Sequence, residues 1–165
     1  NSYAFRMMDL FQKSKMNFIS CPTENAYRQG RQDTYPKRRG LTRVKEFIES
    51  GINVAFAQDS INDPWYPMGN GNMMNILDNG IHLAQTMSPE EIKTSFDLIT
   101  YNGARCLNIQ DTYGLEVGKQ ANFIVLNESS VYEAVRKRAD VLASVRNGDF
   151  LFRRKEMAYD IPLSL

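Results

Sequence analysis

The hydrophobic positions near the start of the chain alternate between helical spacing and short continuous runs. Residues 4–15 carry apolar side chains near the helical period, with charged side chains between them, which predicts a helix. The runs at 17–21 and 52–58 are apolar at strand length, which is typical of strands buried on both faces. Between them, residues 42–51 predict a second helix, capped by Thr42. Right-handed crossovers would then lay the two strands parallel.

The segment between the first strand and the second helix is polar. Pro22 is expected to stop the strand, and residues 23–40 are expected to form a long loop. A loop of this length exceeds what a structural connection needs, so it is either functional or an insertion.

The pattern changes once more along the rest of the chain. Three helices are predicted first, the second of them opening with a capping box at Ser88 and Glu91; they cover residues 71–87, 88–100 and 102–109. After about residue 112 the sequence becomes richer in strand patterns. A strand at 121–126, a short helix at 131–139 and two strands within 139–157 are predicted, the last two joined by a turn at Asn147 and Gly148.

Composition narrows the classes of protein. The 165 residues are 42% hydrophobic, which is enough for a buried core, and 20 basic residues nearly balance 19 acidic ones. This balance gives no reason to expect nucleic acid or a membrane surface as a partner, and no apolar run approaches membrane-spanning length. Cys21 and Cys106 lack CxxC spacing, which indicates reduced, buried thiols and a cytoplasmic protein.

Candidate chemistry gathers after the second strand. Asp59 directly follows it, at the end where ligands bind in parallel α/β proteins, and Trp65 lies in the loop beyond. The pattern alone favours a helix cap or a loop acceptor as the role of Asp59, and Trp65 could be a core anchor. The single histidine, His82, is expected to be a core or half-buried residue of a helix and not a metal ligand. The basic run at 36–45 is read as a solvated helix start in preference to an anion patch.

Three stretches of the chain resemble the carboxyl-terminal part of bacterial cytosine deaminases, in the amidohydrolase superfamily. They are DTYPKRRGLTRVKEFIESGINV, QDSINDPWYPMGNGNMM and GLEVGKQANFIVLN. The resemblance implies an α/β fold, with residues 1–112 as the last part of a distorted (β/α)8 barrel, including its strands seven and eight. Residues 113–165 would then be the carboxyl-terminal segment of the small β-sandwich beside the barrel.

The resemblance also implies roles for individual residues. Asp59 would be both a metal ligand and a catalytic proton carrier, and Trp65 would pack beside a pyrimidine ring. Ser60 stands where the family commonly has a second aspartate, and Gln58 where a histidine is frequent. Since a hydroxyl replaces a carboxylate at Ser60, a substrate-binding position, the preferred substrate is left open.

The implied activity is hydrolytic deamination of cytosine to uracil and ammonia by a longer parent protein that holds Fe²⁺ or Zn²⁺. This chain is expected to be an inactive fragment without bound metal, because the family's histidine ligands are missing from it. We expect a small pyrimidine-like substrate and association between copies through the exposed edge of the barrel. Two alternatives remain open: a hydrolase of another heterocycle, such as isocytosine or an ammelide-type triazine, and a non-catalytic half-barrel binding module.

Overall fold

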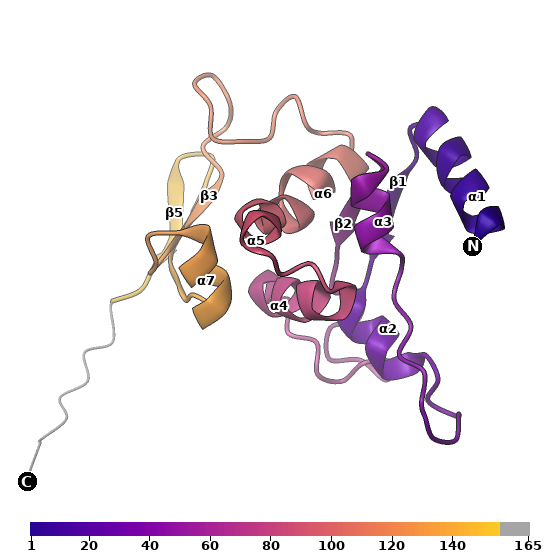
Figure 1. The fold of residues 1–165 in the computed structure, drawn as a ribbon. Coiled ribbons are helices and arrows are strands. Elements are labelled where there is room, and N and C mark those ends of the chain that lie inside the picture. The colour runs from indigo at the N-terminus through magenta and orange to yellow at the C-terminus, as the bar shows by residue number, and fades with distance from the viewer. Residues whose placement is uncertain (156–165) are drawn as a thin grey trace, which may run out of the picture.

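Two short parallel strands form the centre of the first two thirds of the chain. The computed structural model describes residues 1–155, and in it β1 (Asn17–Ser20) pairs with β2 (Asn53–Phe56), as Figure 1 shows. The register runs from Asn17 opposite Asn53 to Ser20 opposite Phe56. The predicted parallel pairing is therefore confirmed, and both strands end at the same edge of the sheet.

Helices surround these strands in the order that the hydrophobic pattern predicts, with one addition. Four helices lie between β2 and the next strand where three are predicted, because the predicted helix at 88–100 divides into two. A capping box at Ser88 and Glu91 opens the second of the four, as predicted. The helices before β2 are α1 (Ser2–Lys13), α2 (Pro22–Arg28) and α3 (Val44–Glu49), and those after it are α4 (Met73–Ala84), α5 (Pro89–Thr94), the 3₁₀ helix η1 (Ser95–Ile99) and α6 (Tyr101–Cys106).

The addition is α2, where the sequence pattern predicts only loop. Pro22 does end β1, but it also occupies the first turn of a helix, where its missing N–H costs nothing. The connecting loop is therefore shorter than predicted and begins after Arg28. The predicted cap at Thr42 is also wrong, because Arg43 precedes α3 and no side chain caps it.

One core holds the strands and helices together. Val54 and Phe56 of β2 are buried, and α4 lies against them so closely that a Cβ at Gly80 would come within 2.3 Å of the Phe56 ring. Phe18 of β1 packs on Phe47 of α3, with ring centroids 4.7 Å apart. The buried apolar residues of this core are Met8, Val44, Phe47, Ile52, Val54, Phe56, Met74, Ile76, Leu77, Ile81, Leu98, Ala134, Val135 and Ala139.

The second sheet is antiparallel and contains β3 (Phe123–Leu126), β4 (Val141–Arg146) and β5 (Asp149–Arg153), in that order. Asn147 and Gly148 join β4 to β5 with positive φ angles, as predicted for the turn. Helix α7 (Val131–Lys137) packs on α4 and α5, and Arg138 pairs with Asp78 of α4 at 2.7 Å. The end of the predicted segment 113–165, residues 156–165, lies outside the described residues, and a domain boundary near residue 112 stays a prediction.

None of the helices in residues 1–155 is long and apolar enough to cross a bilayer.

Candidate active site at the carboxyl ends of the parallel strands

The chain after β2 alternates between buried and exposed side chains at the shared edge of the sheet. The Ala57 amide donates to the Ser20 carbonyl oxygen at 3.0 Å, so pairing continues one residue beyond the strands. Gln58 and Ser60 are then buried, whereas Asp59 between them is exposed. Gln58 donates to the Thr23 hydroxyl at 3.4 Å, which ties this segment to α2.

Asp59 presents an unengaged carboxylate at this edge. Its φ of 66° lies in the left-handed region, which aspartate tolerates better than most residues. Within residues 1–155 the carboxylate takes part in no hydrogen bond or ion pair, and it therefore fills no capping role there. The two oxygens of such a carboxylate can bind a hard cation or a proton.

Cys21 and Glu24 lie at the same edge, beyond the end of β1. Burial raises the pKa of the Cys21 thiol, and the negative charges of Asp59 and Glu24 raise it further. The thiol is therefore neutral near pH 7. Two carboxylates and a protonated thiol thus share this part of the site, and Glu24 is the more buried of the two acids.

The loop beyond Asp59 is held by Asp63. Its carboxylate accepts the backbone amides of Trp65 and Tyr66, both at 2.9 Å. The Tyr66 amide is the largest cause of a lowered pKa at Asp63, with the Trp65 amide, the Ser60 hydroxyl and the charge of Arg28 adding to it. The carboxylate is therefore ionised well below neutral pH, and the loop keeps its turn there.

The ends of this loop meet at Ser60 and Gly69. A Cβ at Gly69 would come within 2.0 Å of the Ser60 carbonyl oxygen, so only glycine permits the two backbone segments to approach this closely. Residues 60–69 consequently form a closed loop at the carboxyl edge of the sheet.

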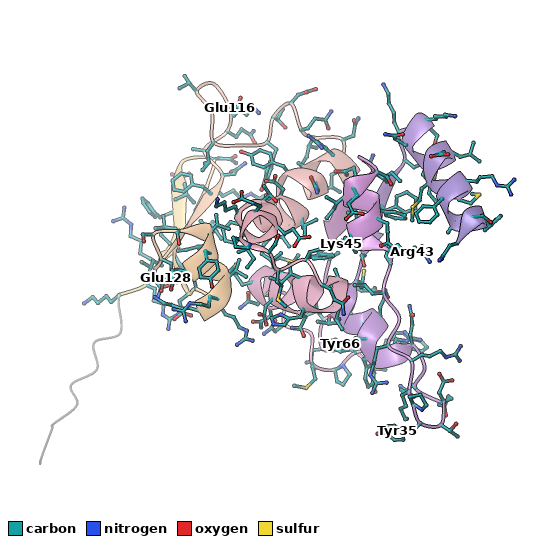
Figure 2. All side chains as sticks on the ribbon, viewed as in Figure 1. Tyr35, Arg43, Lys45, Tyr66, Glu116 and Glu128 are labelled. Atoms are coloured by element: carbon teal, nitrogen blue, oxygen red, sulfur yellow. The ribbon has the colours of Figure 1, made fainter. Side chains whose placement is uncertain are left out.

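Trp65 lies on the outside of that loop and not in the core. It is 61% exposed, so the interpretation as a core anchor is wrong. The guanidinium of Arg28 lies over its ring, 4.7 Å from the centroid. Tyr66 beside it packs edge to face on Tyr27 of α2 at 5.7 Å, and Figure 2 shows Tyr66 next to that helix. The indole is thus oriented by protein contacts yet still accessible to a flat ligand.

The described residues do not form a complete metal site by themselves. No group of three or more histidine, cysteine, aspartate or glutamate side chains in residues 1–155 could hold a metal ion. The prediction that His82 is a core or half-buried residue is wrong, because its side chain is 58% exposed. Its Nδ1 lies 2.7 Å from the Asp78 carbonyl oxygen. Asp59 therefore fits as one oxygen ligand, and further ligands would have to come from elsewhere.

Sequence reasoning missed Glu24 and Arg28. Both belong to α2, whose existence the proline at its start concealed. An acidic residue four positions before a basic one is typical of an ion pair on a helix. This spacing would have indicated the pair if a helix had been predicted here.

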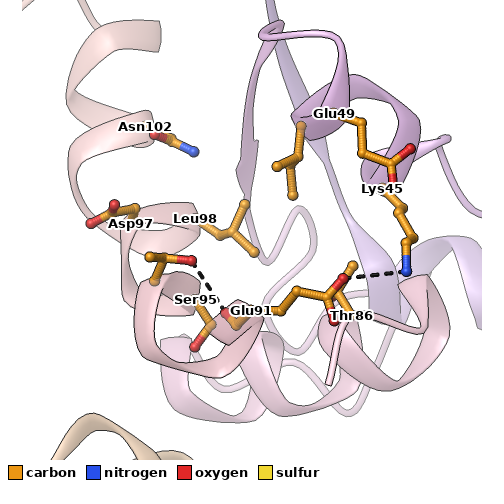
Figure 3. A pocket seen from close by; sticks show the side chains of 10 residues that line it. Lys45, Glu49, Thr86, Glu91, Ser95, Asp97, Leu98 and Asn102 are labelled. Atoms are coloured by element: carbon orange, nitrogen blue, oxygen red, sulfur yellow. Dashed lines mark hydrogen bonds and ion pairs between the residues drawn. The ribbon is translucent and has the colours of Figure 1, made fainter. Parts of the chain in front are cut away.

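A separate cavity of about 240 Å³ lies in the helical layer, among α3, α5, η1 and α6 (Figure 3). Lys45 reaches Glu91 across it at 3.3 Å. Its lining residues are Lys45, Ile48, Glu49, Thr86, Glu91, Thr94, Ser95, Asp97, Leu98 and Asn102. None of these belongs to the strand ends or to the loop 60–69, so the cavity is not part of the candidate site.

Comparison with protein families gives one match over most of the chain. The family model described as "Amidohydrolase family" matches residues 2–152. The N-isopropylammelide isopropyl amidohydrolase of Pseudomonas sp. (strain ADP) is 34% identical over 150 residues, which are 87% of this chain and 32% of that protein. The chain therefore spans about a third of the length of this relative.

Solved structures give a similar result. The 5-methylcytosine deaminase from Klebsiella pneumoniae, crystallised with 5-fluorocytosine, superposes with a TM-score of 0.95 and 47% identity over 98% of this chain and 39% of that one. An adenosine deaminase from Xanthomonas campestris with bound zinc superposes with a TM-score of 0.72 over 94% of this chain and 36% of that one. At 18% identity, this second likeness concerns the fold alone.

Proposed function

This chain belongs to the amidohydrolase family, and from that premise we propose that the protein carrying it is a hydrolytic deaminase of cytosine-like pyrimidines. The resemblance and the α/β fold class expected from the sequence are confirmed by the family match and by the superposition on the Klebsiella enzyme. The single observation that supports the activity most is the exposed, unengaged Asp59 at the carboxyl end of a parallel strand, in a chain 47% identical to a 5-methylcytosine deaminase.

We propose Asp59 as one ligand of a divalent metal, Fe²⁺ or Zn²⁺, and as the proton carrier. When bound, such a metal would supply Lewis acidity and make water a nucleophile near neutral pH. One oxygen of the Asp59 carboxylate would take a proton from the attacking water and return it to the leaving amine, so that ammonia departs. Its φ of 66° and its freedom from other hydrogen bonds in the described part of the chain support this role.

Trp65 and Ser60 are the proposed substrate contacts. An exposed indole held on a closed loop suits a flat base, which binds largely by apolar contact. Ser60 offers a small hydroxyl close to the same edge, a weaker acceptor than a carboxylate. Cytosine is therefore one substrate to test. Cytosines substituted at position 5 should be tested too, because the Klebsiella structure contains 5-fluorocytosine.

The experiment is an ammonia-release assay on the purified full-length protein, loaded in turn with Fe²⁺ and Zn²⁺. Cytosine, 5-methylcytosine, isocytosine and an N-alkylated triazine amine would be compared at equal concentration, with release of the alkylamine measured for the triazine because its hydrolysis frees no ammonia. Release of ammonia from cytosine or 5-methylcytosine supports the proposal. Turnover of the triazine without either cytosine would overturn it.

Asp59→Asn tests the proposed residue directly. We expect kcat to fall by about 10²–10⁴-fold, as is usual for loss of a general acid–base group, with unchanged thermal unfolding. Asp111→Asn is the matched control, because Asp111 is also an exposed aspartate, and it should leave kcat within about twofold. Equal activity of the two variants would contradict the role of Asp59.

A triazine hydrolase is the second candidate. It is favoured by the 34% identity to the N-isopropylammelide enzyme over 87% of this chain. The same substrate panel decides between the two candidates. A protein that turns over none of the compounds, with either metal, would favour the non-catalytic module.

We also propose that the full-length protein is a cytoplasmic homo-oligomer. Cys21 and Cys106 are free thiols, which supports a reducing compartment. Sedimentation of the full-length protein would test its association.

A further inference from the structure

Helix α2 makes two aromatic contacts with the loop 60–69. Arg28 lies over the Trp65 ring at 4.7 Å, and Tyr27 packs on Tyr66 at 5.7 Å. These are consecutive residues of the helix and consecutive residues of the loop. The orientation of the indole therefore depends on α2 as well as on the Asp63 turn.

Arg28 is itself fixed from below by Glu24. The Glu24 carboxylate is 4% exposed, and its Oε1 accepts a hydrogen bond from the Arg28 guanidinium at 3.1 Å. Its Oε2 is buried without a hydrogen-bond partner in the part of the chain that the structure describes. A buried carboxylate is costly unless a positive charge compensates it, so Glu24 holds Arg28 in place strongly.

Arg28 also acts on Asp63, the residue that holds the loop. Its positive charge helps to lower the pKa of Asp63, whose carboxylate holds the Trp65 and Tyr66 amides. One guanidinium thus covers the ring of Trp65 and favours the turn that carries it.

We propose that the Glu24–Arg28 pair is a positioning device for Trp65, which sets the angle of the indole and so the affinity for the flat substrate. This inference rests on the proposed function, in which Trp65 contacts the base. Arg28 is a positioning residue in this scheme, since it acts through the indole and touches no reacting atom.

The chemistry of the contact requires arginine. A planar guanidinium stacks on an aromatic face, whereas a lysine ammonium keeps the charge but not the plane. Arg28→Lys should therefore preserve the pairing with Glu24 but hold the Trp65 indole less firmly in its orientation. Arg28→Met should lose both.

The test uses the full-length protein labelled with 5-fluorotryptophan and observed by ¹⁹F NMR. Trp65 is the one tryptophan of this chain, and Trp65→Phe assigns its resonance. We expect Arg28→Met to shift that resonance and to raise KM for the pyrimidine about tenfold, with kcat within about twofold. Arg28→Lys should lie between Arg28→Met and the unmodified protein in both measurements.

Arg136→Met is the matched control. Arg136 also pairs with a glutamate of its own helix, Glu133, at 2.7 Å, but it lies in α7 and covers no aromatic ring within residues 1–155. It should change neither the Trp65 resonance nor KM.

An unchanged resonance and KM in Arg28→Met would overturn the proposal, as would a loss confined to kcat. If Arg28→Met does not fold, Arg28→Lys gives the same two readouts with the buried charge still compensated. If the protein acts on no pyrimidine, the proposed function fails on the assay alone, whereas the resonance still decides whether Arg28 positions Trp65.

Discussion

At the scale of single residues, the candidate site depends on neighbours with opposite burial. Gln58 and Ser60 point into the protein and fasten the backbone, so Asp59 between them is left outside with its carboxylate unengaged. Asp59 has a left-handed φ of 66°, three residues beyond the end of β2. The exposed carboxylate thus lies between two buried neighbours.

The Asp63 turn should respond to acid. Because the backbone amides lower the folded-state pKa of Asp63, its contribution is complete above the ordinary aspartate pKa and is lost as the pH falls through the lowered value. We expect the ¹⁹F resonance of Trp65 to move in that acidic range. Asp63→Asn, whose amide oxygen can still accept both N–H groups, should keep the native resonance and abolish this titration. A titration that persists in Asp63→Asn would contradict the assignment.

Candidate site residues could be predicted only where the residue type and its place in the sequence indicate a chemical role. Asp59 and Trp65 were singled out because the resemblance covers their segment, since a carboxylate after an apolar run is a weak signal by itself, and their roles stay predictions. The exposure of Trp65 could not be predicted, because it depends on a closure between Ser60 and Gly69 that no periodicity encodes. The pairing of Glu24 with Arg28 required knowing that α2 is a helix.

At the scale of elements, α4 packs closely against β2. Gly80 brings the helix onto the ring of Phe56, which is 3% exposed and has no room to move aside. The strand that carries Asp59 is thereby supported from behind by a helix in direct contact. The position of the site thus depends on this packing.

Two glycine substitutions should have opposite effects on stability. Gly80→Ala would place a methyl group 2.3 Å from the Phe56 ring and should cost about 1–3 kcal/mol by overpacking. Gly103→Ala in α6 meets no atom within 4 Å and should stabilise the protein by up to about 1 kcal/mol through helix propensity. Urea unfolding of the two variants and the unmodified protein would measure both changes. A stabilising Gly80→Ala would show that the helix can move away.

Element types were largely predictable, because they follow from the spacing of apolar residues. The parallel strands, the capping box of α5 and the turn between β4 and β5 are as expected. Helix α2 was missed because it is short and polar and starts with proline, so its stability comes from tertiary contacts such as those of Tyr27 and Arg28.

At the scale of the whole molecule, the parallel sheet of residues 1–155 has two strands, and each of them has one edge with no strand beside it. Many large apolar side chains are also exposed, among them Ile19 of β1 and Ile124 of β3. Open strand edges and apolar patches of this kind usually bind further protein.

The 165-residue chain by itself should therefore self-associate and hold no stoichiometric metal. Light scattering at rising concentration would measure the first, and elemental analysis after dialysis the second, with the full-length protein as the comparison. A monomer at high concentration would contradict the first expectation. One bound metal per chain would contradict the second and the proposed sharing of ligands with Asp59.

The meeting of Ser60 with Gly69 has a consequence for protein engineering. Because both ends of the loop meet at one close backbone approach, we expect the residues between them, with Asp63 kept, to be exchangeable as a cassette without displacing β2. Libraries that randomise this cassette and keep its two end residues would explore new ligand preferences on an unchanged scaffold. Changing Gly69 itself would instead open the cassette and disturb Asp59.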